Sequence, residues 1–300
     1  MSIWRVKPIS AFEADMKKST LKRVLGKWSL TAIGVGAIIG GGIFVLTGTG
    51  AYYHAGPALA ISFIIAGIAC VFAALCYSEF ASILPVEGSA YAYAYGTIGE
   101  IFAWIIGWGL ILEYAMGSMT VAVSWSGYFN KLLLKFGISL PDWLTTDPAS
   151  YTGEGFSMNL PAFLIVLLVI SILIKGTQNA AKANNMIVIL KVSAVLFVII
   201  AGAFFINFDN WSPFIPEATQ IVEKETTHNA YGLTGIVSGA AAIFFAYVGF
   251  DAVSTQAGEA INPKKDVPFA IIASLLICTT LYILVSLVLT GMMNYQDFNP

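Results

Sequence analysis

The amino-acid sequence predicts an all-α membrane protein whose chain crosses the bilayer several times, and three observations indicate this class. Of 300 residues, 58% are hydrophobic and only 11% are charged, with a mean hydropathy of +0.80. A soluble domain carries about 25% charged residues, so this chain could not cover such a surface. Charged residues are absent from Trp28 to Ser78, a run longer than the roughly 20 residues of one span. The apolar segments are continuous rather than alternating, which excludes a β-barrel.

Seven apolar segments are predicted as spans, with polar or turn-forming residues between them. His54, Gly56 and Pro57 divide the long charge-free run into the first two. The predicted spans cover residues 29–51, 58–84, 99–126, 160–175, 184–206, 232–257 and 267–293. They group into spans one to five and spans six and seven, at 29–207 and 232–293, with 1–28, 208–231 and 294–300 outside the membrane.

The lysine and arginine residues predict which side of the membrane each loop faces. Eleven of them lie in the N-terminal segment and in the loops after spans four and six. The opposite loops hold three. By the positive-inside rule, we expect a cytoplasmic N-terminus, with residues 208–231 and 294–300 in extracellular loops. No apolar signal region precedes the first span, so we expect a multi-pass protein of the cell membrane.

The first span contains a glycine-rich stretch in its middle. Five of the nine residues from Gly34 to Gly42 are glycine, including three in a row. Each glycine costs a helix roughly 1 kcal/mol relative to alanine. Close helix packing through Gly36 and Gly40 accounts for one glycine face, but not for three consecutive glycines, which cover every face. We therefore predict an interrupted helix near residues 40–42, whose freed backbone groups line a cavity or bind a ligand.

The two sides of this predicted break suit different charges. The half-helix that begins near Gly42 points its positive end at the break, which favours a carboxylate. The preceding half ends near Ile38 and offers carbonyl oxygens, which favour an ammonium group. A ligand that carries both groups would fit this site.

The sixth span repeats the pattern, with Gly249 and Asp251 close together in its middle. Asp251 has two interpretations: an N-cap that starts a second half-helix, or a direct contact with a substrate amine or cation. Two broken helices five spans apart are typical of an inverted-repeat transporter. In that architecture the site lies at the membrane midplane between the two breaks.

Lys191 and Glu113 are ionisable residues far from the ends of their spans. A charge at the centre of a span costs roughly 2.5–3.5 kcal/mol, so it normally faces a partner, a cavity or a pathway. Lys191 either extends to the cytoplasmic headgroups or acts as an internal cation that gains and loses a proton. Glu113 is its proton partner, a substrate-facing group or a packed protonated acid.

Four stretches of the chain carry a family pattern. They read GVGAIIGGGIFVLTGTGA, YSEFASILPVEGSAYAYAYGTIGE, GWGLILEYAMGSMTVAVSWSGY and FFAYVGFDAVSTQAGEAINPKKDVPFAI. In this order they resemble the amino acid–polyamine–organocation (APC) superfamily, specifically its bacterial cationic amino acid transporter branch. The resemblance implies a LeuT-like inverted-repeat fold with about twelve spans, and proton-coupled amino acid uptake across the bacterial inner membrane by alternating access.

The resemblance also assigns roles to individual residues. It places the carboxylate contact on the backbone of Gly41 and Gly42. It places the ammonium contact on carbonyl groups near Ile38, Phe245 and Val248, with Phe245 also acting as a gate.

The charged residues and the length have counterparts as well. Lys191 matches the fifth-span lysine that replaces a sodium ion in this branch, and Glu113 matches the third-span acid. The 300 residues would be spans one to seven, so we expect the front portion of a longer chain.

Several alternatives follow from the same observations. A proton-independent exchanger of amino acids or polyamines would share the fold. A channel would not need paired helix breaks, and a retinal-binding receptor would need a lysine in the last span. We do not expect an enzyme, because neither histidine lies mid-span and there is no HExxH motif or carboxylate pair.

The expected partners are an amino acid substrate and membrane lipid. We expect no cofactor and no metal, with protons as the coupling ion. Nucleic acid is excluded, because 15 Lys and Arg against 17 Asp and Glu leave no basic face. The preference for cationic or neutral substrates and the presence of a small accessory subunit stay open.

Overall fold

The computed structural model describes residues 4–18, 21–148, 150–153, 155–174, 177–223 and 226–298. Within these residues, five helices are long and apolar enough to cross a membrane, judged by length and composition. They are Gly42–Ile83, Glu100–Lys135, Lys182–Ala203, Gly232–Thr255 and Pro263–Met292, and Leu160–Ile174 is a shorter apolar helix. The predicted class, an all-α protein with many membrane-spanning helices, is confirmed.

The chain folds into two compact units, described separately here: residues 1–106 with 183–300, and residues 107–182. The first part of the larger unit contains α1 (Ile9–Lys18), α2 (Lys27–Ile38), the π-helix η1 (Gly42–Leu46), α3 (Thr47–Gly50), the π-helix η2 (Ala51–Ala55), the 3-10 helix η3 (Gly56–Ala58), α4 (Leu59–Ile83) and α5 (Ser89–Thr97). After residue 182 follow most of α8 (Thr177–Ala203), then η5 (Phe208–Trp211), β1 (Thr219–Glu223), β2 (Thr226–Ala230), α9 (Gly232–Ile243), η6 (Phe244–Tyr247), α10 (Ala252–Thr255), η7 (Ala257–Glu259), α11 (Pro263–Met292) and η8 (Tyr295–Asp297).

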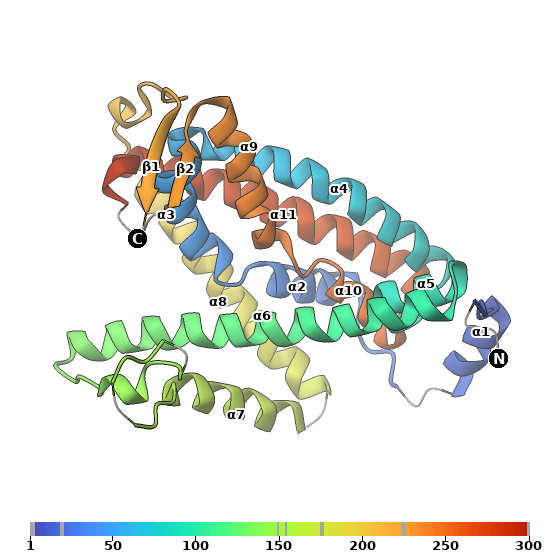
Figure 1. The fold of residues 1–300 in the computed structure, drawn as a ribbon. Helices are drawn as coiled ribbons and strands as arrows, with labels where there is room; N and C mark the ends of the chain where they lie inside the picture. Colours follow the sequence, from blue (N-terminus) through green and yellow to red (C-terminus); the bar gives the residue numbers. More distant parts are fainter. Residues whose placement is uncertain are drawn as a thin grey trace. The chain divides into compact units, whose positions relative to one another are not determined.

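The core of the larger unit forms where α4 and α11 lie side by side, with α2 against α11 and α9 against α4 (Figure 1). Buried residues of α11 recur every three or four positions, so one face of the helix points inward, as at Ser274, Cys278 and Tyr282. Glycines bring the neighbouring helices close. A Cβ at Gly34 of α2 would lie 2.6 Å from Ser274 Oγ, and one at Gly67 of α4 would lie 2.9 Å from Thr279 Cγ2.

The smaller unit contains most of α6 (Glu100–Lys135), the 3-10 helix η4 (Asp142–Leu144) and α7 (Leu160–Ile174). The side chain of Asn159 precedes α7 and accepts hydrogen bonds from Ala162 N at 3.1 Å and Ser126 Oγ at 2.6 Å. The first bond is that of an N-cap, and the second ties the start of α7 to α6. These two bonds to Asn159 therefore fix the residue at which α7 begins.

The structure adds three elements to the predicted spans and extends one of the spans. The hairpin of β1 and β2, antiparallel with Thr219 opposite Ala230, lies in a region predicted as a loop. β-branched residues such as Ile221 and Val222 favour it. Helices α1 and α5 lie outside the predicted spans, and α6 continues beyond the predicted end at residue 126 to Lys135. The first and sixth predicted spans are interrupted, as their glycines predict.

Candidate functional site

The break in the first predicted span lies between α2 and η1. Helix α2 ends at Ile38, and the helix resumes at Gly42. Ile39 leaves the helical region at ψ 83°, and Gly40 N donates to Ile38 O at 2.8 Å in a tight turn. The predicted interruption near residues 40–42 is therefore confirmed.

The break in the sixth predicted span is longer. Helix α9 ends at Ile243, the 3-10 turn η6 follows, and α10 begins at Ala252. Between them Val248 is extended at ψ 134°, and Gly249 takes a φ of +117°. That φ is rarely adopted by residues with a side chain, so the glycine is required where the chain reverses. This break is also confirmed.

The two breaks cross at van der Waals distance. A Cβ added to Gly42 would lie 2.9 Å from the Cβ and 3.0 Å from the Cα of Ala246. A Cβ added to Gly249 would lie 2.9 Å from the carbonyl carbon and oxygen of Ala37. Each broken span thus places one glycine against an alanine of the other, and only a bare backbone fits at either contact.

Lys191 of α8 binds the first break. Its Nζ donates to Gly36 O at 2.6 Å and to Ile39 O at 2.7 Å. Helix α8 can approach because Gly36 has no side chain: a Cβ there would lie 3.0 Å from Val188 Cγ2 and 3.1 Å from Asn184 Oδ1. The ammonium group therefore supplies donors to carbonyls near the end of α2, instead of extending to the headgroups.

Tyr282 of α11 contacts both breaks, and the sequence prediction missed it. Its hydroxyl lies 3.0 Å from Ile38 O and 2.9 Å from Ala246 O. The signal available in the sequence was a single aromatic residue with a polar atom in an otherwise aliphatic part of the last span. Nothing in the sequence indicates which backbone groups it would reach.

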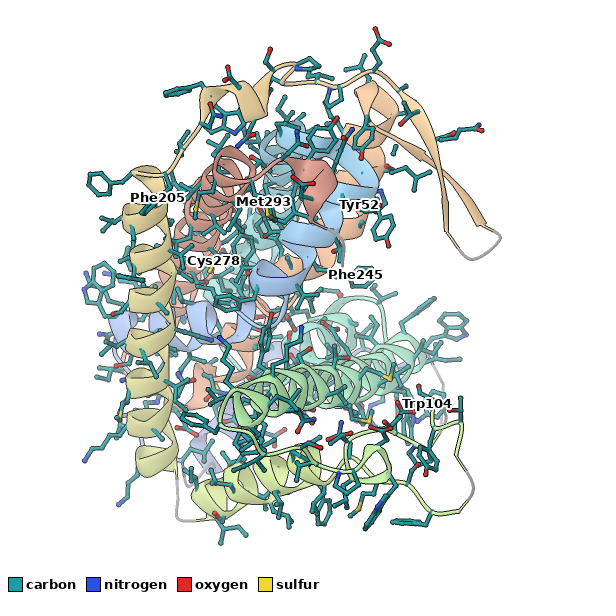
Figure 2. The ribbon with its side chains drawn as sticks, turned by 90° about the vertical axis from the view of Figure 1, so that its left-hand side faces the viewer. Tyr52, Trp104, Phe205, Phe245, Cys278 and Met293 are labelled. Atoms are coloured by element: carbon teal, nitrogen blue, oxygen red, sulfur yellow. The ribbon has the colours of Figure 1, made fainter. Side chains whose placement is uncertain are left out.

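The predicted substrate residues lie at the crossing, in different surroundings. Gly41 and Gly42 start η1, and Val248 follows η6. The carbonyl of Ile38 accepts hydrogen bonds from both Gly40 N and Tyr282. Phe245 is 74% exposed, and Figure 2 shows it at the edge of the larger unit, whereas Cys278 lies among the helices.

Asp251 has the position of an N-cap without the bond. It precedes α10, but its side chain makes no capping hydrogen bond. Its backbone oxygen instead accepts from the hydroxyl of Ser254 at 2.6 Å. The side chain is only 6% exposed. Placement at a helix start is thus confirmed, whereas a direct substrate contact stays a prediction.

Glu113 lies in the smaller unit, on the exposed side of α6, whereas Lys191 belongs to the larger unit. Its roles as proton partner, substrate contact or packed acid stay predictions. Among the described residues, no group of three or more His, Cys, Asp or Glu side chains could hold a metal ion.

Residues 25–299 match the family model described as "Amino acid permease". The chain belongs to the amino acid permease family. The chain is 47% identical over 298 residues to the methylthioribose transporter of Bacillus subtilis (strain 168), and equally to the branched-chain amino acid permease BcaP of that organism. It is 40% identical over 273 residues to cationic amino acid transporter 3, mitochondrial, of Arabidopsis thaliana.

The matches cover most of this permease but only part of each relative. They include 99% of this chain and 61% of each Bacillus protein, and 90% of this chain and 43% of the Arabidopsis protein. The chain thus spans about three fifths of the length of its bacterial relatives. The family match and the apolar helices together indicate a multi-pass membrane protein.

Proposed function

We propose that this permease is a secondary transporter that takes up amino acids across the cell membrane, coupled to protons, by alternating access in a LeuT-like inverted-repeat fold. The observation that carries the proposal is the ammonium group of Lys191, bound to Gly36 O and Ile39 O within an apolar helix. An ionisable group at such a depth is costly unless it has a partner or a function. Lys191 has a hydrogen-bonded partner, the first break, and under this proposal the same break also holds the substrate.

The substrate would lie where the two breaks cross. The first amide groups of η1, at Gly41 and Gly42, suit a carboxylate, because the start of a helix carries partial positive charge. Carbonyl oxygens near Ile38, Phe245 and Val248 suit the ammonium group. Both groups of an amino acid would then be held by backbone atoms, which leaves its side chain to the wider pocket.

Lys191 would link this geometry to the proton. While protonated, it makes two charge-assisted hydrogen bonds, each worth roughly 1.5–3 kcal/mol. Loss of the proton removes the charge and weakens both bonds, so the end of α2 is held less firmly. Renewed protonation restores them. The shape of the first break therefore depends on the proton, as coupled transport requires.

Uptake into proteoliposomes with an imposed proton gradient tests this coupling. Lys191→Ala should bind substrate but lose gradient-driven accumulation. Lys182→Ala is the matched control, because Lys182 is an exposed lysine of the same helix, and it should accumulate substrate normally. Normal accumulation by Lys191→Ala would remove the lysine from the mechanism. Uptake that requires amino acid inside the vesicles, but no proton gradient, would identify an exchanger.

The substrate class needs a separate experiment. The relatives are named for branched-chain amino acids, for cationic amino acids and for methylthioribose. Methylthioribose has neither a carboxylate nor an ammonium group, so its competition distinguishes an amino acid site from a site for another class of substrate. Competition against labelled leucine and lysine uptake by amino acids, polyamines and methylthioribose, at two external pH values, would assign the class. Inhibition by methylthioribose alone would contradict the proposed amino acid site.

A further inference from the structure

The hydroxyl of Tyr282 lies where the two broken spans cross, although Tyr282 belongs to neither span. It is 3.0 Å from the carbonyl oxygen of Ile38, the last residue of α2, and 2.9 Å from that of Ala246 in η6. Ala246 is also the residue against which Gly42 packs at the crossing described above. One side chain from α11 therefore reaches both breaks at the point where they meet.

The phenol ring is held in place on all sides. Tyr282 is fully buried, at 0% exposure. Its ring centroid is 5.4 Å from that of Phe63 in α4 and 5.4 Å from that of Tyr247 in η6. Tyr247 is itself fixed, because its hydroxyl donates to Phe63 O at 2.8 Å. The Tyr282 hydroxyl therefore has a fixed position, and the two carbonyl oxygens are hydrogen-bonded to it only when they lie close to that position.

A single proton serves two acceptors at this point. A tyrosine hydroxyl donates only one hydrogen bond, yet two carbonyl oxygens lie within hydrogen-bond distance. The two breaks can share this donor only while they remain together. If they separate, the hydroxyl can stay with only one of them. Either Ile38 O is left with the bond from Gly40 N alone, or Ala246 O loses the Tyr282 donor, and the loss of a donor is unfavourable for a buried carbonyl.

We propose that Tyr282 is a positioning residue that couples the two breaks, so that both halves of the substrate site keep one relative position. The inference rests on the proposed function for what the breaks hold, but not for the coupling itself. It differs from the role of Lys191, which contacts only the first break and carries a charge. Loss of the Tyr282 hydroxyl should weaken substrate binding without changing the dependence of uptake on external pH.

Transport kinetics test the first part. Tyr282→Phe keeps the ring and removes the hydroxyl, and it should raise the KM for uptake roughly tenfold with little change in maximal rate. Tyr231→Phe is the matched control. It also removes the hydroxyl of a buried tyrosine, but that hydroxyl donates to Tyr52 O in η2, at 2.7 Å, and not to either break. Its KM should stay at the wild-type value. An equal rise in both variants would indicate general loosening and overturn the proposal.

Hydrogen exchange of the intact protein in lipid nanodiscs tests the coupling without substrate. Tyr282→Phe should speed amide exchange at residues 39–42 and 247–251 together, and Tyr231→Phe should not. Unchanged exchange at either break in Tyr282→Phe overturns the proposal. If the wild-type protein takes up no amino acid, the proposed function fails, and this measurement still decides the role of Tyr282.

A second variant covers failure of Tyr282→Phe to accumulate in the membrane. Tyr282→His keeps an N–H donor on a shorter side chain, which can reach one carbonyl but not two. We expect faster exchange at one break only. Wild-type protection at both breaks in this variant would show that no shared donor is needed, and would overturn the proposal.

Discussion

The two broken spans of this chain differ in how their backbone groups are hydrogen-bonded. The first break, between α2 and η1, is short and, beside its own Gly40 N–Ile38 O bond, receives side-chain hydrogen-bond donors from two other helices. Lys191 of α8 binds Gly36 O and Ile39 O, and Tyr282 of α11 reaches Ile38 O. Its carbonyl groups are thus held from two sides by side chains that lie far away in the sequence.

The second break is longer and holds much of its own structure. Its turn residues form a 3-10 helix, η6, and Ser254 donates to Asp251 O from both its backbone N, at 2.8 Å, and its hydroxyl. Tyr247 anchors η6 to α4 through Phe63 O. Only Ala246 O uses the donor from α11.

This difference indicates that the two breaks have different roles. A break held by outside donors, one of them charged, can change shape when a donor changes protonation. A break held by local turns and a buried aromatic ring serves as a fixed reference. Under the proposed coupling, the first break would respond to the proton, and the second would be the reference against which it moves. The predictions below test this difference, from the largest expected effect to the smallest.

The largest effect is expected from Gly249→Ala, which attacks the fixed second break. The alanine would have to adopt a φ of +117° and place its Cβ 2.9 Å from the carbonyl group of Ala37. Backbone strain of roughly 1–2 kcal/mol adds to overpacking of roughly 1–3 kcal/mol. We expect a strong loss of thermal stability in detergent. Gly88→Ala is the control, because its φ is +113° but its nearest contact is a comfortable 3.4 Å. Equal losses would mean that strain alone matters.

A smaller effect is expected from Gly42→Ala in the first break. Its Cβ would press on the Cβ and Cα of Ala246, at 2.9 and 3.0 Å, and push the breaks apart. Overpacking of roughly 1–3 kcal/mol corresponds to a loss of substrate affinity of about tenfold or more. Binding can be measured by scintillation proximity. Gly48→Ala in α3 should bind normally, because its nearest contact is 3.8 Å away. Wild-type affinity in Gly42→Ala would remove the crossing from the site.

Ser254→Ala should cost about 1 kcal/mol of stability. It removes one buried hydroxyl that donates within the second break, at 2.6 Å to Asp251 O. Since the backbone bond remains, we expect a modest fall in melting temperature with the KM unchanged. Ser171→Ala removes a similar bond, to Leu168 O, from an exposed serine and should change neither quantity. A raised KM in Ser254→Ala would show that the second break also adapts to substrate.

The smallest effect concerns pH at the segment that follows the second broken span. Burial raises the pKa of Glu259, and the nearby Glu87 raises it further. A carboxyl group with a raised folded pKa stabilises the fold below its unfolded pKa of about 4.3, and this contribution disappears as the pH rises through the folded value.

The amides of Val24 and Leu25 report on this region, because both donate to Glu259 O at 2.9 Å. Between about pH 4 and about pH 7 their protection, corrected for intrinsic exchange, should fall slightly. In Glu259→Gln it should stay constant. A rise in protection with pH would reverse the sign and contradict the role of this carboxyl group.

The sequence was sufficient for the features that depend on local composition. Three consecutive glycines predict the first break, and the glycine with an acidic residue predicts the second. The depth of Lys191 in its span indicates an inward-facing cation. Each conclusion follows from a residue type that is costly in a continuous apolar helix.

The missing parts depend on three-dimensional proximity. No pattern indicates that Ala37 and Ala246, two ordinary small residues, form the opposite sides of the glycine contacts. Tyr282 reads as a core aromatic residue, and only the fold brings its hydroxyl to carbonyl groups from two other helices. The hairpin of β1 and β2 was missed because each strand is short and has few apolar residues, and its register depends on pairing between the two strands.

The segment between the first break and α4 has a mechanical property of its own. Helix α3 (Thr47–Gly50) lies between two π-helices, η1 and η2. A π-turn closes over one residue more than an α-turn, so each flank of α3 stores one extra residue. Loss of the extra residue from one flank would turn α3 by about 100° relative to that flank, the rotation of one residue in a helix. The face that Thr47–Gly50 presents therefore depends on both wide turns being kept.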